Sequence, residues 1–242
     1  MARYVEDLVL ILPIISGPDW EDPAIVPVPL GDPAGVDLGR LRIAFYTSAP
    51  GYNQPTQETL DTVRAAARAV SDLVSTVKED VPEPISRVPE LSKRVGDGDG
   101  RATMLRVLER AGTTEFAPYI RSLRDKASAI STEEFTLALE ELDRYRSDML
   151  MFMRSYDAVI CPTAAFPAPP HGETFADENR NAFYTAPYNL TGWPGAVVRC
   201  GTSPEGLPIG VQVVSRPWRE DVALALAAVL ESAFGGYVRP DL

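Results

Sequence analysis

A long amphipathic segment that leads directly into a short apolar run constrains the fold of this chain most. Over residues 132–155, apolar residues recur at helical spacing, which predicts a helix with one buried face. This apolar stripe consists of Phe135, Leu139, Leu142, Tyr145, Met149 and Phe152. Residues 157–161 (Asp-Ala-Val-Ile-Cys) follow at once and are typical of a buried strand. Helices that alternate with such strands build α/β folds.

The ends of this predicted helix carry two further expectations. Thr132 stands where an N-cap is needed, and its hydroxyl suits that position. Methionines cluster at the other end, where we interpret them as core packing. They are Met149, Met151 and Met153.

The same two patterns recur along the rest of the chain. Helical spacing predicts helices at residues 3–15, 55–77, 101–111, 116–130, near 178–186 and 221–234. Short apolar runs predict strands at 42–46, 195–200 and 209–214, the last two joined as a hairpin. A segment dense in proline, glycine and aspartate at 17–39 predicts a loop. The sequence therefore predicts an α/β fold in which a mixed β-sheet is flanked by helices.

The charge balance narrows the choice of partners. The chain has 23 basic and 34 acidic residues, a net charge of −11. An acidic surface repels phosphate backbones and anionic lipid, so we expect no nucleic-acid partner and no membrane partner. The apolar run at 8–15 is too short to span a bilayer. Because Glu6 and Asp7 precede it, where a signal peptide carries positive charge, we expect a cytoplasmic protein.

The sequence offers little that could hold a metal or a cofactor. Cys161 and Cys200 each follow an apolar run, which indicates free thiols on strands in a reducing compartment. The glycine- and aspartate-rich segment 96–100 is superficially similar to a calcium loop, but Arg101 occupies a position that needs an oxygen ligand. We therefore predict a flexible turn there, no metal and no cofactor.

Three segments together carry a family resemblance. Residues 1–8 (Met-Ala-Arg-Tyr-Val-Glu-Asp-Leu) are similar to a "GPMAR-x-V-x-D" helix, and 157–163 match a "D-x-hydrophobic-hydrophobic-x-P-T" strand with a proline-rich exit. Residues 189–194 and 206–214 are similar to an "N-x-T-G-x-P" and "G-L-P-x-G-x-Q" pair. These are motifs of the amidase-signature family, and their order and spacing make the resemblance specific.

The resemblance implies a catalytic mechanism whose serine and lysine residues are missing from this sequence. Enzymes of the family cut amides, and sometimes esters, through a serine nucleophile, with a lysine acting as base through a second, cis-peptide serine. Their nucleophile lies in a "G-G-S-S-G-G"-type segment, whereas this sequence has no Ser-Ser dipeptide. Its lysines, Lys78, Lys93 and Lys126, stand in polar surroundings, where an exposed lysine keeps its proton and makes a poor base. We therefore assign no catalytic residue.

The resemblance also implies how this chain is organised. In the family the three catalytic positions precede the helix that residues 1–8 match, so we expect residues 1–242 to be a single, partial amidase-signature domain. The helical region at about 75–130 matches no motif and is expected to vary with the substrate. The expected partners are a small-molecule amide substrate and an N-terminal amidase segment. A sheet divided in this way leaves an unpaired edge and an exposed apolar face, which predicts a homo-oligomer.

By resemblance, two loops face the active-site region. The expected substrate-binding residues are Pro162, Thr163, Phe166, Asn189, Thr191, Gly192 and Trp193. Asn189 and Thr191 suit closure of their own turn better than ligand binding, and Trp193 suits a core position as well as an acyl-pocket wall. We expect Gln212 to satisfy backbone groups and Asp157 to orient the strand that it begins.

Three hypotheses about function follow. The first is the C-terminal portion of an amide hydrolase that supplies scaffold and substrate-pocket wall. The second is a non-catalytic binding module on a hydrolase scaffold, since fold does not imply function. The third is a hydrolase with a rebuilt nucleophile at Ser155, Thr163 or Cys161, although no base stands beside any of them in the sequence. His171, the only histidine, lies in a proline-rich stretch and is expected to be a loop residue.

Overall fold

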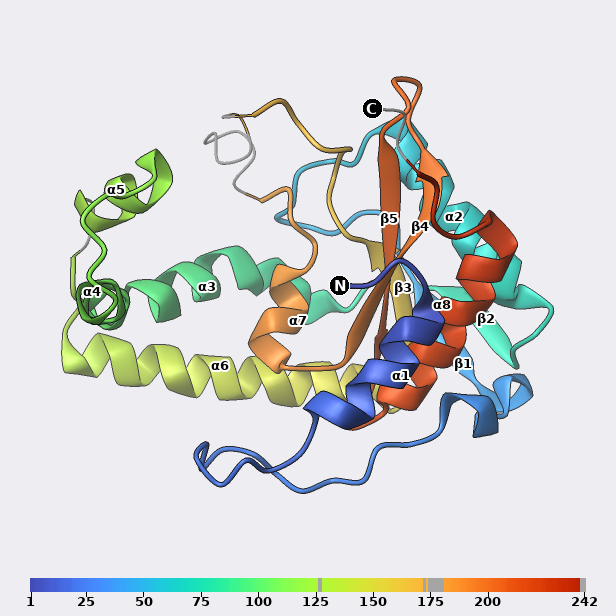
Figure 1. The fold of residues 1–242 in the computed structure, drawn as a ribbon, viewed down its shortest axis with the longest axis horizontal. Helices are drawn as coiled ribbons and strands as arrows, with labels where there is room; N and C mark the ends of the chain where they lie inside the picture. The colour runs from blue at the N-terminus through green and yellow to red at the C-terminus, as the bar shows by residue number, and fades with distance from the viewer. Residues whose placement is uncertain (126–127, 172, 174–180, 240–242) are drawn as a thin grey trace.

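A five-stranded mixed sheet forms the centre of the protein (Figure 1). The computed structural model describes residues 1–125, 128–171, 173 and 181–239. In chain order the strands are β1 (Arg42–Phe45), β2 (Thr76–Glu79), β3 (Ala158–Pro162), β4 (Gly195–Thr202) and β5 (Pro208–Ser215). Their order across the sheet is β2-β1-β3-β5-β4, with β1 parallel to β2 and β3, and β5 antiparallel to β3 and β4. The predicted mixed sheet and its β4–β5 hairpin are confirmed.

Helices cover both faces of this sheet. The helices of the described residues are α1 (Val5–Ile15), α2 (Gln57–Ser71), α3 (Val88–Asp97), α4 (Ala102–Arg110), α5 (Pro118–Asp125), α6 (Thr132–Met153), α7 (Ala186–Thr191) and α8 (Glu220–Phe234). Three short 3₁₀ helices are found at Pro33–Gly35, Leu38–Arg40 and Glu83–Arg87. Helices α4 and α5 lie away from the sheet, beyond the far ends of α3 and α6 (Figure 1). None of the helices within the described residues has the length and apolarity needed to cross a membrane.

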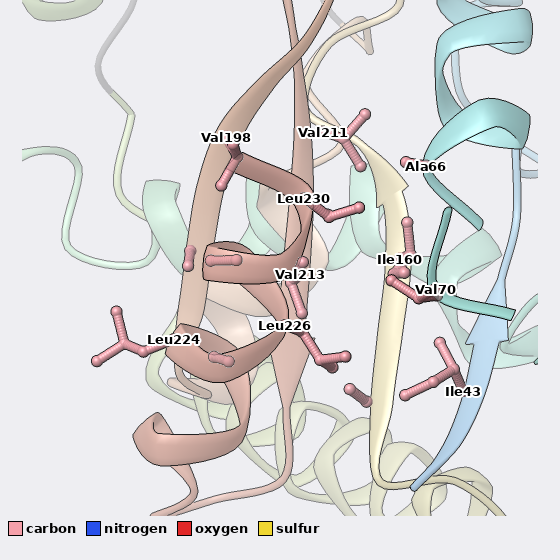
Figure 2. Close-up of a cluster of buried hydrophobic side chains, with 14 of the residues drawn as sticks. Ile43, Ala66, Val70, Ile160, Val198, Val211, Val213, Leu224, Leu226 and Leu230 are labelled. Atoms are coloured by element: carbon pink, nitrogen blue, oxygen red, sulfur yellow. The ribbon is translucent and has the colours of Figure 1, made fainter. Parts of the chain in front are cut away.

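One face of the sheet packs against α2 and α8 through aliphatic side chains. Ile43, Ile160 and Val213 from three different strands meet Val70 of α2 and Leu226 of α8, all fully buried (Figure 2). Helix α1 packs outside α8, and residues such as Val5 and Leu12 turn toward it. Because strand side chains alternate between faces, the neighbours of these residues point to the opposite side of the sheet.

The opposite face packs against α3, α6 and α7 and is rich in tyrosine. Ala44, Val159 and Val214 of the sheet meet these helices in a second buried cluster. The hydroxyls of Tyr46 and Tyr188 lie 3.1 Å apart. The Tyr145 hydroxyl of α6 donates to the Pro187 carbonyl at 2.9 Å. Buried tyrosines keep a polar end that needs a partner, so these bonds join α6 and α7 to the sheet.

The expectations for the long helix need three corrections. Ser131 is the N-cap in place of Thr132, and it forms a capping box with Glu134. Leu139 is exposed, whereas the buried stripe of α6 consists of Ala138, Leu142, Tyr145, Met149 and Met153. Met151 is 59% exposed, so only two of the three methionines are core residues.

Elsewhere the chain differs from the predicted elements near its prolines. Helix α2 ends at Ser71, and residues 76–79, predicted as the end of that helix and the chain after it, form β2. Helix α3 was not predicted, and it includes Gly96 and Asp97 from the segment 96–100 that was predicted to be a flexible turn. Helix α7 contains residues 189–191, the first half of the motif at 189–194. The other described predictions at 3–15, 101–111 and 221–234 are confirmed within a few residues.

Candidate active-site pocket wall

A hollow of about 590 Å³ lies where β3 ends. One wall is the loop that leaves β3, residues 163–169, together with His171. The other is formed by Phe183 and by residues 208–210, where β5 begins. The volume falls within the roughly 300–1,000 Å³ that is usual for small-molecule sites.

Backbone hydrogen bonds hold the two walls together. The Ala165 amide donates to the Ala182 carbonyl at 2.8 Å, and the Tyr184 amide donates to the Thr163 carbonyl at 3.0 Å. An antiparallel bridge between Ala164 and Phe183 lies between these bonds. Because the bonds clamp both sides of the bridge, the loop leaves β3 in a defined conformation.

The side chain of Gln212 also links the end of β3 to the segment that contains Phe183. Its side-chain amide donates to the carbonyls of Pro162 and Tyr184, both at 2.8 Å. The side chain is buried on β5, where an amide must find partners. The expectation that Gln212 satisfies backbone groups is confirmed. Gln212 does not line the hollow itself, but it holds together the two segments that do.

Thr163 and Gly210 form one corner of the hollow. The Thr163 hydroxyl is buried and has no hydrogen-bond partner among the described residues. A Cβ at Gly210 would lie 3.4 Å from this hydroxyl oxygen and 3.0 Å from Cγ1 of Val197. Glycine at position 210 therefore keeps this corner from being filled.

The candidate nucleophiles lack activation. Burial raises the pKa of the Cys161 thiol to about 12, so the reactive thiolate is disfavoured near neutral pH. Ser155 is exposed and precedes β3, whereas the hollow follows the other end of that strand. The Thr163 hydroxyl has no base bound to it among the described residues.

The described lysines are committed elsewhere. Lys78 pairs with Asp80 at 3.1 Å, and Lys93 pairs with Asp97 at 3.3 Å. A hydrogen bond from Lys78 to the Asp80 side chain raises the pKa of Lys78, which opposes a role as base. Lys126 lies outside the described residues. Both cysteines are free, as predicted, and no cluster of metal-ligating side chains occurs within the described parts of the chain.

The predicted site residues fall into two groups. Thr163 and Phe166 line the hollow, and Pro162 is the last residue of β3 beside it. Residues 189–193 do not line it. Sequence reasoning did not assign Phe183, Ile209 or Gly210 to the site; the "G-L-P-x-G-x-Q" motif was a signal for Gly210.

The second group has visible structural roles. Thr191 donates its hydroxyl to the Tyr188 carbonyl at 3.1 Å, which closes the last turn of α7. Gly192 has a φ of 70° and ends that helix in the left-handed conformation that glycine adopts without strain. Asn189 is exposed, and Trp193 is partly buried against the tyrosine-rich cluster. A role for these four residues in substrate binding stays a prediction.

Asp157 lies at the end of the sheet opposite the hollow. Its carboxylate accepts the Arg42 amide at 2.9 Å and contacts the guanidinium groups of Arg42 and Arg216, each at 3.1 Å. Burial pushes the pKa of Asp157 upward, but hydrogen bonds from Arg42 and the two positive charges bring it below the usual value. The expectation that Asp157 orients its strand is confirmed.

Apolar side chains remain uncovered on the β4 side of the molecule. β4 is an edge strand, and its Val197 is 52% exposed. Helix α1, which packs on α8 over β4, exposes one whole side, and the residues there are 42–71% exposed: Leu10, Ile11, Ile14 and Ile15. Val197 points to the face of the sheet opposite α8, because its neighbours Ala196 and Val198 pack in the cluster with α2 and α8. The exposed side chains of α1 therefore form a separate apolar patch, and patches of this kind mark interaction surfaces.

Comparisons with known proteins match the whole of this architecture. The family model described as Amidase matches residues 1–224. The chain is 28% identical over its whole length to a glutamyl-tRNA(Gln) amidotransferase subunit from Salinispora arenicola and covers 56% of it. It is 29% identical to fatty-acid amide hydrolase 2-B of Danio rerio, again over its whole length, and covers 49% of that protein.

A solved structure gives the same result for the fold. The structure of 6-aminohexanoate cyclic dimer hydrolase with its substrate superposes with a TM-score of 0.81 at 24% identity, over 96% of this chain and 54% of the other. The chain therefore spans about half the length of the relatives that it matches.

Proposed function

Since the chain belongs to the amidase family, we propose that it supplies scaffold and one wall of the substrate pocket of an amide hydrolase. The hollow at the end of β3 carries this proposal, because residues of two family motifs, Thr163 and Gly210, meet there. The substrate is a small amide, or an ester of similar shape, and no cofactor takes part. The serine nucleophile and the lysine base come from a segment that this sequence does not contain.

The exposed surfaces on the β4 side support the proposal that a partner carries the segment with the nucleophile and the base. An exposed face of α1 and an unpaired β4 edge are the surfaces that a further part of the same fold would cover. Without that part, two copies bury these surfaces against each other, so we propose that the isolated chain forms a homo-oligomer. Two free, buried thiols support a reducing, cytoplasmic setting.

The test of the proposal uses a fluorophosphonate probe, which labels activated serines. The purified chain is incubated with the probe, and its intact mass is measured beside a full-length amidase. We expect the full-length enzyme to gain one adduct and this chain to keep its mass. An adduct at Ser155, Thr163 or Cys161 would contradict the proposal and support a rebuilt hydrolase.

A non-catalytic binding module remains the second candidate. It is favoured by the combination of an open hollow with the absence of an activated nucleophile among the described residues. The two candidates differ when the chain is paired with a nucleophile-bearing amidase segment. Amide hydrolysis by the pair supports the hydrolase, whereas ligand binding with no turnover by any pair supports the module.

A further inference from the structure

Building on the proposed function, we infer that the part of the substrate that enters the hollow is an uncharged, apolar group, an aryl or branched alkyl group of a neutral amide. The hollow has no acidic or basic side chain in its described lining apart from His171, which is exposed. Its other walls are aromatic, aliphatic or proline side chains, with Thr163 as the single hydroxyl.

A charged group would lose part of its hydration against these walls and gain no counter-charge from the described lining. Phe166 and Phe183 present hydrocarbon to any occupant, and burial of an unpaired charge against hydrocarbon is strongly unfavourable. The charged pairs described for the β3 strand, around Asp157, lie at its other end. The lining therefore selects against carboxylates and ammonium groups alike.

The walls are held in place, so the hollow does not readily rearrange to admit a charge. The backbone bonds of Ala165 and Tyr184 fix the loop, and Gln212 holds the junction from beneath. Gly210 leaves the corner beside Thr163 unfilled. A flat ring or a branched chain suits a hollow with two phenylalanine walls, because aromatic faces stack on apolar groups.

The experiment compares a neutral amide with two derivatives that each carry a charged substituent on the ring. Phenylacetamide, its 4-carboxy derivative and its 4-aminomethyl derivative are titrated into the complete chain, and binding is followed by NMR. We expect the neutral amide to bind at least about tenfold more tightly than either charged derivative. Equal or tighter binding of a charged derivative, or no binding of the neutral amide up to its solubility, would overturn the inference.

Two variants locate the binding. Phe166→Ala removes a wall of the hollow and should weaken binding of phenylacetamide by about tenfold. Phe152→Ala is the matched control, because Phe152 is a partly buried ring on α6 that does not line the hollow. It should leave binding unchanged, and equal effects of the two variants would contradict the assignment.

The experiments distinguish failure of this inference from failure of the proposed function. If the neutral amide is preferred but no nucleophile-bearing segment restores hydrolysis, the selectivity stands and the hydrolase proposal fails. If a restored pair hydrolyses the carboxy derivative with an equal kcat/KM, the hydrolase proposal stands and the inferred substrate class is wrong.

Discussion

The two edges of the sheet differ in how they meet the solvent. β2 is four residues long and carries Lys78 and Glu79, the short and charged edge by which proteins avoid unwanted strand pairing. β4 is eight residues long and exposes Val197 at 52% on one face, while its other face packs against α8, on which α1 lies. The difference supports the proposal that the β4 side is an interface, whereas the β2 edge is protected as an outer edge of the sheet.

The prediction with the largest expected effect concerns the exposed apolar side of α1 and its role in self-association. Leu10→Gln, Ile14→Gln and Ile15→Gln together should weaken self-association about a hundredfold, because each side chain loses about 1 kcal/mol of apolar burial in the complex. Since all three are 71% exposed and glutamine is a good helix former, the free energy of unfolding should change by less than about 1 kcal/mol. Sedimentation velocity over a concentration series measures the association.

Leu73→Gln provides the matched control for the triple variant. Leu73 is 47% exposed on the β2 side, between α2 and β2, and should leave self-association unchanged. An isolated chain that stays monomeric at high concentration, or a control as damaging as the triple variant, would remove the distinction between the two edges.

The second prediction concerns the stability that the ion pairs of Asp157 give to the sheet away from the β4 edge. Asp157→Asn should lower the free energy of unfolding by about 1–2 kcal/mol at neutral pH, because Arg42 and Arg216 lose a charged partner that is only partly exposed. The lowered pKa of Asp157 means that its stabilisation is present above an unfolded-state pKa of about 4 and is lost as the pH falls through the lower folded pKa.

Urea unfolding at several pH values measures this dependence. The difference between the parent protein and Asp157→Asn should shrink below about pH 4. A constant difference from neutral to acid pH would show that packing, and not the charge of Asp157, orients the strand.

The smallest effect concerns the pocket corner. Thr163→Val should leave the free energy of unfolding unchanged or raise it by up to about 1 kcal/mol, because an unpartnered buried hydroxyl is removed. Thr191→Val is the control, since that hydroxyl donates to the Tyr188 carbonyl and its loss should destabilise by about 1 kcal/mol. Thermal unfolding measures both, and a destabilised Thr163→Val would reveal a partner for that hydroxyl.

Prolines account for much of what the sequence did not predict. No helix was predicted at Pro89 or Pro187, and these two residues lie in the first turns of α3 and α7. The first turn does not need the missing N–H, so a proline there starts a helix as readily as it ends one. The strong periodicity of α6 and α8 predicted both helices, because burial of one face outweighs local signals.

The pocket could be predicted only in part for a different reason. Thr163 and Phe166 follow β3 directly, so the motif located them. Phe183 and Ile209 come from separate parts of the chain and meet this loop through a bridge and a strand pairing, which depend on tertiary structure. The motif of Asn189 predicted a turn, whereas the structure places Asn189 on the exposed side of helix α7.

We propose that this chain is one part of an amidase fold whose β4 side receives the part with the nucleophile. The most direct measurement co-expresses the chain with the N-terminal half of a full-length amidase and records copurification and amide hydrolysis, with the reference enzyme's own two halves as the positive control. We expect a stable pair, slower hydrogen exchange in α1 and β4 but not in β2, and restored hydrolysis. If the reference halves pair while this chain stays alone and α1 exchanges freely, the claim is contradicted.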